Sequence, residues 1–197
     1  MVEDFSPVDA PPDPAAAEAA PLTPEQFHHK LASDLSDMVW GLLEKEGRTC
    51  SETDRMIHAV HASRFHYEFG GTPLNLAIGE WQCARVHATV GQADSAFYHA
   101  NRALEFAEDY QLGAFPTALA HEACARALAK ADPARSADHL RRARATLEEI
   151  ADPDDRAMVE RDLATVPEAG GAGVVSVTTG SVSASGTVSE QRPTFKA

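Results

Sequence analysis

The sequence predicts an all-α protein of about seven helices, arranged as antiparallel helical hairpins. Alanine is abundant and β-branched residues are scarce before residue 167, a composition that favours helices over strands. Helix start and stop signals recur along the chain, and the segments between them carry apolar residues at helical spacing. Because the connections between these segments are short, we expect successive helices to lie antiparallel.

The predicted helical domain spans residues 23–167, and a segment of different composition flanks it on each side. Residues 1–22 are acidic and rich in proline and alanine, and they lack a basic segment or apolar core typical of a signal peptide. Residues 168–197 are rich in glycine, serine, threonine and valine. Neither segment carries enough apolar surface to order itself, so we expect a disordered arm at each end.

The first helix is expected over residues 24–46. Thr23 can cap its start, Pro24 suits the first helical position, and Gln26 can complete a reciprocal capping box. Apolar residues at helical spacing support this helix: Phe27, Leu31, Leu35, Met38 and Leu42.

The second helix is expected over residues 52–69, beginning near Ser51. Gly70 and Gly71 follow it, and we expect them to form a left-handed glycine cap. A third helix over residues 73–90 begins with a threonine and a proline, as the first does.

The remaining helices follow the same signals. Glycines precede the fourth and fifth helices, and an aspartate followed by a proline begins each of the last two. The four helices are expected over residues 92–109, 115–130, 133–151 and 153–165.

The segment ARVHATVGQADSAFYHANRALEFAE, residues 84–108, carries small residues at fixed offsets over two helices. These are Ala84, Gly91, Ala96 and Ala103, followed by Leu104. The pattern resembles a tetratricopeptide repeat, a helix-turn-helix unit of roughly 34 residues. A partial second copy is expected over residues 115–150. The resemblance implies a short right-handed solenoid, similar to small bacterial tetratricopeptide-like proteins.

The resemblance also implies which residues line the concave face, because the first helix of each pair lies there. That face would carry Trp81, Gln82 and Arg85 from one pair, and Glu122 and Arg126 from the next. Two arginines at matching positions could clamp a carboxylate through bidentate hydrogen bonds. Alternatively, both arginines are solvated or paired with neighbouring acids such as Glu122.

Residues 54–75 contain three histidines within one predicted helix. His58 and His61 lie three residues apart, so their rings could converge on one metal ion, whereas His66 points away from them. A third ligand would have to come from the next helix, which offers Glu80, Cys83 and His87. No ligand motif with diagnostic spacing occurs, so we assign no metal site, cofactor or catalytic residue and expect half-buried, hydrogen-bonded imidazoles. His99, His121 and His139 are expected at the surface or at interfaces.

Charge and cysteine content exclude several classes of function. The formal net charge of −13 and the pI near 5.0 argue against binding to nucleic acid or to an anionic membrane surface. The three cysteines are widely spaced and form no CxxC motif, which favours the reducing cytoplasm over a disulfide framework.

The sequence therefore predicts a non-enzymatic binding or adaptor module that recognises a protein segment or peptide on a concave helical face. The alternative is a small-molecule or catalytic site between the second and third helices, built from His58, His61, Trp81 and Arg85. A small anionic ligand and a homodimer are further candidate partners.

Overall fold

The computed structural model describes residues 21–167, and within that range every regular element is an α-helix. Our expectations of disorder concern residues that lie almost entirely outside this range. In chain order, the helices are α1 (Pro24–Leu43), α2 (Cys50–Gly70), α3 (Pro73–Thr89), α4 (Ala93–Asp109), α5 (Ala114–Leu128), α6 (Pro133–Leu147) and α7 (Pro153–Ala164). The prediction of an all-α protein with seven helices is confirmed for the described residues.

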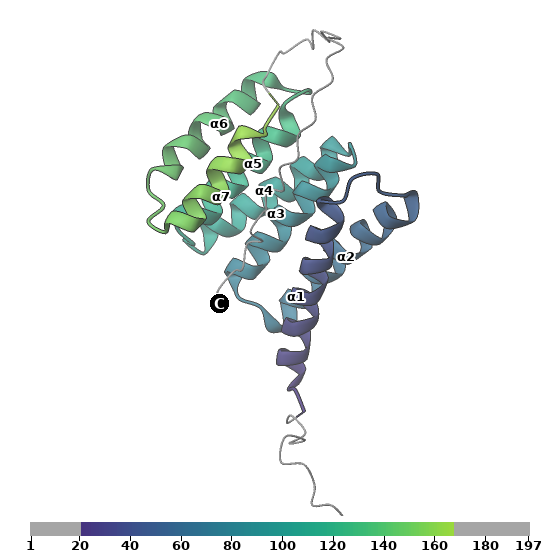
Figure 1. The fold of residues 1–197 in the computed structure, drawn as a ribbon. Coiled ribbons are helices and arrows are strands. Elements are labelled where there is room, and N and C mark those ends of the chain that lie inside the picture. The colour runs from purple at the N-terminus through teal and green to yellow at the C-terminus, as the bar shows by residue number, and fades with distance from the viewer. Residues whose placement is uncertain (1–20, 168–197) are drawn as a thin grey trace, which may run out of the picture.

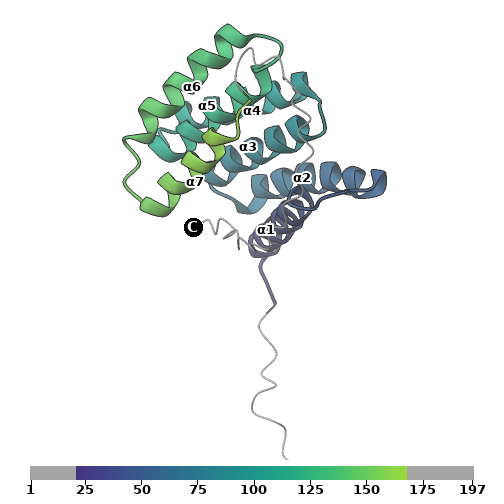
Figure 2. The same ribbon diagram turned by 45° about the horizontal axis from the view of Figure 1, so that its top comes forward.

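The helices pack mainly with their neighbours in the sequence, as Figures 1 and 2 show. Three pairs pack along their lengths: α1 with α2, α3 with α4, and α5 with α6. Helix α3 also contacts α5, while α7 lies against α5 and α6. No helix in the described part of the chain has the length and apolar character needed to cross a membrane.

Threonine or aspartate side chains cap the starts of α1, α2, α3, α6 and α7, whereas α4 and α5 have no side-chain cap. The capping box predicted at Thr23 and Gln26 is present. Helix α2 begins earlier than expected, because Thr49 rather than Ser51 caps it. The Thr49 hydroxyl accepts a hydrogen bond from the Glu52 amide at 3.2 Å, and Glu52 accepts one from the Thr49 amide at 3.0 Å. The pair satisfies two amides that the helix leaves without partners.

Helices α1 and α6 end three and four residues before their predicted limits. Helix α1 stops at Leu43, where the Arg48 guanidinium donates to the carbonyls of Leu42 and Leu43 at 2.7 and 2.8 Å. These contacts satisfy carbonyls that the next helical turn would otherwise occupy. Helix α6 ends at Leu147, four residues before the predicted limit at residue 151.

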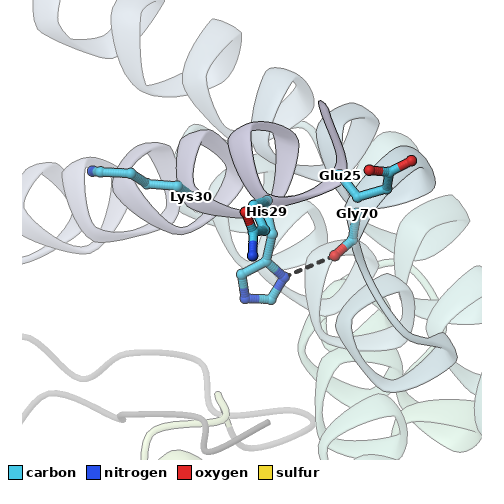
Figure 3. Close-up of a pocket in the computed structure, with 5 residues that line it drawn as sticks. Glu25, His29, Lys30 and Gly70 are labelled. Carbon is cyan, nitrogen blue, oxygen red and sulfur yellow. Dashed lines mark hydrogen bonds between the residues drawn. The ribbon is translucent and has the colours of Figure 1, made fainter. Parts of the chain in front are cut away.

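The left-handed cap predicted at Gly70 and Gly71 is wrong. Gly70 is the last residue of α2, and Gly71 has an extended backbone with a φ of −108°. Gly70 instead lets α2 approach α1, because a Cβ atom there would lie 2.3 Å from the Glu25 carbonyl oxygen and 2.8 Å from the His29 amide. The His29 ring bonds to the Gly70 carbonyl at 2.8 Å beside a shallow pocket (Figure 3).

The core combines many alanines with a few large side chains. Trp81 is 1% exposed and packs against Trp40, with a separation of 5.4 Å between the ring centroids. A second cluster, around Val39, Met56 and Val60, joins α1 and α2 to α3. Small side chains let neighbouring helices pack closely, which brings longer side chains at the seam edges within reach of one another.

Replacing Gly70 with alanine should destabilise the protein by roughly 1–3 kcal/mol, because the added methyl would meet the α1 backbone. Gly41→Ala is the matched control: Gly41 lies within α1 and has nothing within 4 Å of the added Cβ. There alanine should raise stability by about 0.5–1 kcal/mol through helix propensity. Urea unfolding monitored by circular dichroism measures both changes, and equal effects would contradict the close approach at Gly70.

Candidate functional site

Helix α3 carries polar side chains toward two different sets of helices. Glu80 and His87 interact with residues of α2 and α4, whereas Arg85 interacts with residues of α5 and α7. The two sets of contacts form separate polar clusters. We call them the arginine–carboxylate network (Arg85, Glu122, Arg126 and Asp162) and the histidine cluster (His61, His87 and His99).

The arginine–carboxylate network joins α3, α5 and α7. Arg85 Nη2 donates to Asp162 Oδ1 at 2.8 Å, and Arg85 Nη1 lies 3.6 Å from Glu122 Oε1. Arg126 Nε donates to the same Glu122 oxygen at 2.7 Å, and Arg126 Nη2 contacts it as well. The Glu122 carboxylate thus lies between two guanidinium groups, which matches the predicted pairing of both arginines with a neighbouring acid.

Arg126 also binds the end of α7. Its Nη2 donates to the Asp162 carbonyl at 2.9 Å and to Thr165 Oγ1 at 2.7 Å, and its Nη1 donates to the Thr165 carbonyl at 3.1 Å. The last carbonyls of a helix have no partner within the helix and carry its negative dipole end, so a guanidinium there is favourable. The guanidinium groups of Arg85 on α3 and Arg126 on α5 are therefore already hydrogen-bonded to the C-terminal end of α7.

Burial opposes the negative charge of Glu122 in this network. The Glu122 side chain is fully buried, and this burial raises the pKa of its carboxyl although Arg126 and Arg85 act in the opposite direction. Three buried polar atoms at α3 and α5 make no hydrogen bond: Trp81 Nε1, Arg85 Nη1 and Glu122 Oε2. Burying a polar atom without a hydrogen-bond partner has a cost in free energy.

Trp81 and Gln82, predicted on an open concave face, are only 1% and 2% exposed. Trp81 belongs to the hydrophobic core, and Gln82 Nε2 donates to the Ser36 carbonyl of α1 at 3.2 Å. Neither side chain is available to a partner, so the prediction that they line an open face is wrong. Their positions on α3 face the neighbouring helices because the α1 hairpin packs over them.

The histidine cluster contains one predicted residue, His61, and one residue that was considered as a third ligand, His87. Their Nε2 atoms lie 3.0 Å apart. The third member is His99 of α4, which we expected at the surface or an interface; its ring centroid lies 5.2 Å from that of His61. His58 is exposed and lies outside this cluster. No sequence signal links His61 to His99, because they lie on different helices.

The alternative site built from His58, His61, Trp81 and Arg85 is not assembled in the described structure. His61 contacts His87 and His99, whereas Arg85 contacts Glu122 and Asp162. Two further pairs of histidines join neighbouring helices elsewhere. The Nδ1 atoms of His28 and His66 lie 2.7 Å apart, and those of His121 and His139 lie 3.1 Å apart.

Comparison with known proteins finds no matching family model, no matching curated protein and no matching solved structure. Functional proposals for this chain therefore rest on the geometry of the described residues.

Removing Arg126 should destabilise the protein by about 3 kcal/mol, because Arg126→Ala takes away the closest cation of buried Glu122 and three contacts to the end of α7. Arg141→Ala is the matched control, since Arg141 is an arginine whose side chain is 73% exposed. Its effect should stay within about 0.5 kcal/mol. Similar unfolding free energies for the two variants in urea would contradict the network.

Stability should fall as the pH is lowered from about 6.5 to about 4. Burial, followed by the charge of His139, lowers the pKa of His121 to about 4 from its ordinary value of 6.5. The unfolded chain then binds a proton at higher pH than the folded chain, so acid favours unfolding in this window. Burial also lowers the pKa of His61, His87 and His139, which adds to the same trend.

The measurement is the unfolding free energy in urea as a function of pH for the wild type and His121→Gln. The variant should show a shallower loss of stability, while His58→Gln, at an exposed position, should leave the slope unchanged. The raised pKa of Glu122 contributes with the opposite sign, and it is present in all three proteins. An unchanged slope in His121→Gln would contradict the assignment.

Proposed function

We propose that the protein is a non-enzymatic binding module, tetratricopeptide-like in architecture, that binds a protein segment on the face formed by α3 and α5. One observation carries this proposal. Arg85 and Arg126 on that face already hold a polypeptide segment, α7, through the Asp162 side chain and the last carbonyls of the helix. A face that binds the carboxylate and the last carbonyls of one helix of the chain can bind the same groups on a helix of a partner.

The packing of the helices supports the repeat architecture. Helices α1, α3 and α5 each contact the next odd-numbered helix, and α3, α5 and α7 each contact the even-numbered helix before them, as expected when helical pairs stack side by side. Ala84, Ala96 and Ala103 are buried, and Gly91 turns the corner between α3 and α4 with a φ of 79°. These are the positions on which the tetratricopeptide resemblance was based.

The chemistry of α7 indicates what the partner segment should offer. Asp162 provides its carboxylate to Arg85, and the backbone carbonyls of Asp162 and Thr165 accept hydrogen bonds from Arg126. Because guanidinium groups bind carboxylates and helix C-terminal carbonyls well, the partner should present an acidic residue near the end of a helix. Helix α7 itself is short, and it packs against α5 and α6 rather than along α3.

A labelled synthetic peptide of residues 152–167 tests this proposal by fluorescence anisotropy with the full-length protein. Asp162→Asn removes the carboxylate that binds Arg85, so α7 should leave the face more readily. The variant should then bind the peptide about tenfold more tightly than the wild type, which corresponds to loss of one charge-assisted hydrogen bond. Adding Arg85→Ala to this variant should abolish the gain.

Two controls separate specific binding from general attraction. Arg141→Ala in the Asp162→Asn protein should leave binding unchanged, because Arg141 is an exposed residue of α6. A peptide that itself carries Asp162→Asn should bind more weakly than the wild-type peptide. The proposal fails if both peptides bind equally, or if Arg85→Ala and Arg141→Ala have the same effect.

A further inference from the structure

The histidine cluster brings together imidazoles from three consecutive helices. His61 lies on α2, His87 in the last turn of α3, and His99 in α4. Each ring offers one nitrogen atom, and the three atoms lie within 4.8 Å of one another. The rings of His87 and His99 are stacked, with an angle of 2° between their planes, while His61 closes the cluster from the exposed side.

Neighbouring oxygens fix the tautomers of two of these rings. His87 Nδ1 lies 2.7 Å from Gln92 Oε1, and His99 Nδ1 lies 2.7 Å from Glu80 Oε2. Both oxygens accept hydrogen bonds, so each Nδ1 carries the proton and each Nε2 presents a lone pair. An imidazole held through Nδ1 by a carboxylate or carbonyl oxygen is the usual arrangement of a histidine metal ligand.

The support around Glu80 is itself ordered. Arg64 Nε donates to Glu80 Oε1 at 2.9 Å, while the other carboxylate oxygen accepts from His99. Burial would raise the pKa of Glu80, but the contacts with His99 and Arg64 outweigh it and lower this pKa. Glu80 therefore remains a carboxylate that orients His99.

The three rings have too few N–H groups directed into the cluster to donate a hydrogen bond to every Nε2 lone pair. A neutral His61 has one ring N–H, which can donate from Nε2 to His87 Nε2 across 3.0 Å. The Nε2 lone pair of His99 then receives no proton from the other two rings. Burial, followed by the neighbouring imidazole charges, lowers the pKa of His61; burial also lowers that of His87. Burial therefore favours the neutral form of His61 and His87, which is the form of imidazole that binds metal.

We infer that His61, His87 and His99 form a binding site for a divalent transition metal ion of the Zn²⁺ type. Zn–N bonds of about 2.0–2.1 Å in a tetrahedral site would place the nitrogens about 3.3 Å apart. The three nitrogens now lie within 4.8 Å of one another, so the wider separations would have to shorten, while His61 Nε2 and His87 Nε2, at 3.0 Å, would move slightly apart. His61, on its exposed side, has room for that adjustment. Three protein ligands leave a fourth position for water or another donor.

Cys83 is the remaining potential ligand beside the cluster. Burial raises the pKa of its thiol, and the S–H group points to the Val60 carbonyl at a sulfur–oxygen distance of 3.8 Å. A protonated thiol is a poor metal ligand. Its sulfur lies 4.0 Å from His61 Nδ1, where it can accept a weak hydrogen bond when His61 Nε2 binds the metal. Imidazole ligands favour zinc, copper and nickel over magnesium and calcium.

The test is calorimetric titration of the metal-free, full-length protein with zinc chloride. We expect one ion per chain with a dissociation constant near or below about 1 µM, and no binding of magnesium. His99→Gln should weaken zinc binding at least about 100-fold by removing one ligand. Glu80→Gln should weaken it by roughly 10–100-fold through loss of ring orientation.

His58→Gln is the matched control, because His58 lies on the same helix as His61 but outside the cluster. It should leave the affinity unchanged. NMR spectra of the histidine ring nitrogens in the wild type provide a second measurement, which does not depend on the folding of any variant. Zinc should shift the signals of His61, His87 and His99. The paired rings elsewhere, at His28, His66, His121 and His139, should keep their signals.

Three results would overturn the inference. One is an absence of saturable zinc binding, or saturation only above about 100 µM, the range of a chance contact with surface imidazoles. Another is an equal loss of affinity in His58→Gln and His99→Gln. The third is a zinc-induced shift confined to the paired histidines outside the cluster.

Discussion

Close approach of neighbouring helices is the constraint on which this structure depends. Buried alanines line the contacts among α3, α4 and α5, including Ala84, Ala100, Ala103 and Ala123, and Gly70 gives α2 the same access to the α1 backbone. A larger side chain at such a position would push two helices apart or force strain into the core. Because each alanine buries little apolar surface, large residues such as Trp81 must supply much of the core contact.

This close packing determines where the long polar side chains go. They cannot enter seams filled by alanine, so those of α3 extend to the edges of the seam and meet side chains from other helices there. Buried polar groups need partners, and the contacts of His87 and Arg85 both follow from that need. One helix thereby contributes to two polar clusters with different chemistry.

Two buried glutamates illustrate how local partners decide chemistry. Glu80 has one oxygen on Arg64 and the other on His99, and its pKa is lowered. Glu122 is fully buried with one oxygen lacking a hydrogen bond, and burial raises its pKa despite two nearby arginines. Glu80 is suited to orient a metal-binding imidazole, whereas Glu122 belongs to a face that holds the end of another helix.

The sequence by itself determined the helices, because capping residues, prolines and apolar spacing act within a few residues of one another. It also led to the expectation that Arg85 and Arg126 could pair with Glu122, since the tetratricopeptide resemblance would place these residues on adjacent first helices. Only the tertiary structure decided that Asp162 joins them, that Gly70 serves a helix contact rather than a cap, and that His99 completes a cluster with His61 and His87. These outcomes depend on the distance and rotation between helices far apart in sequence, which local patterns do not encode.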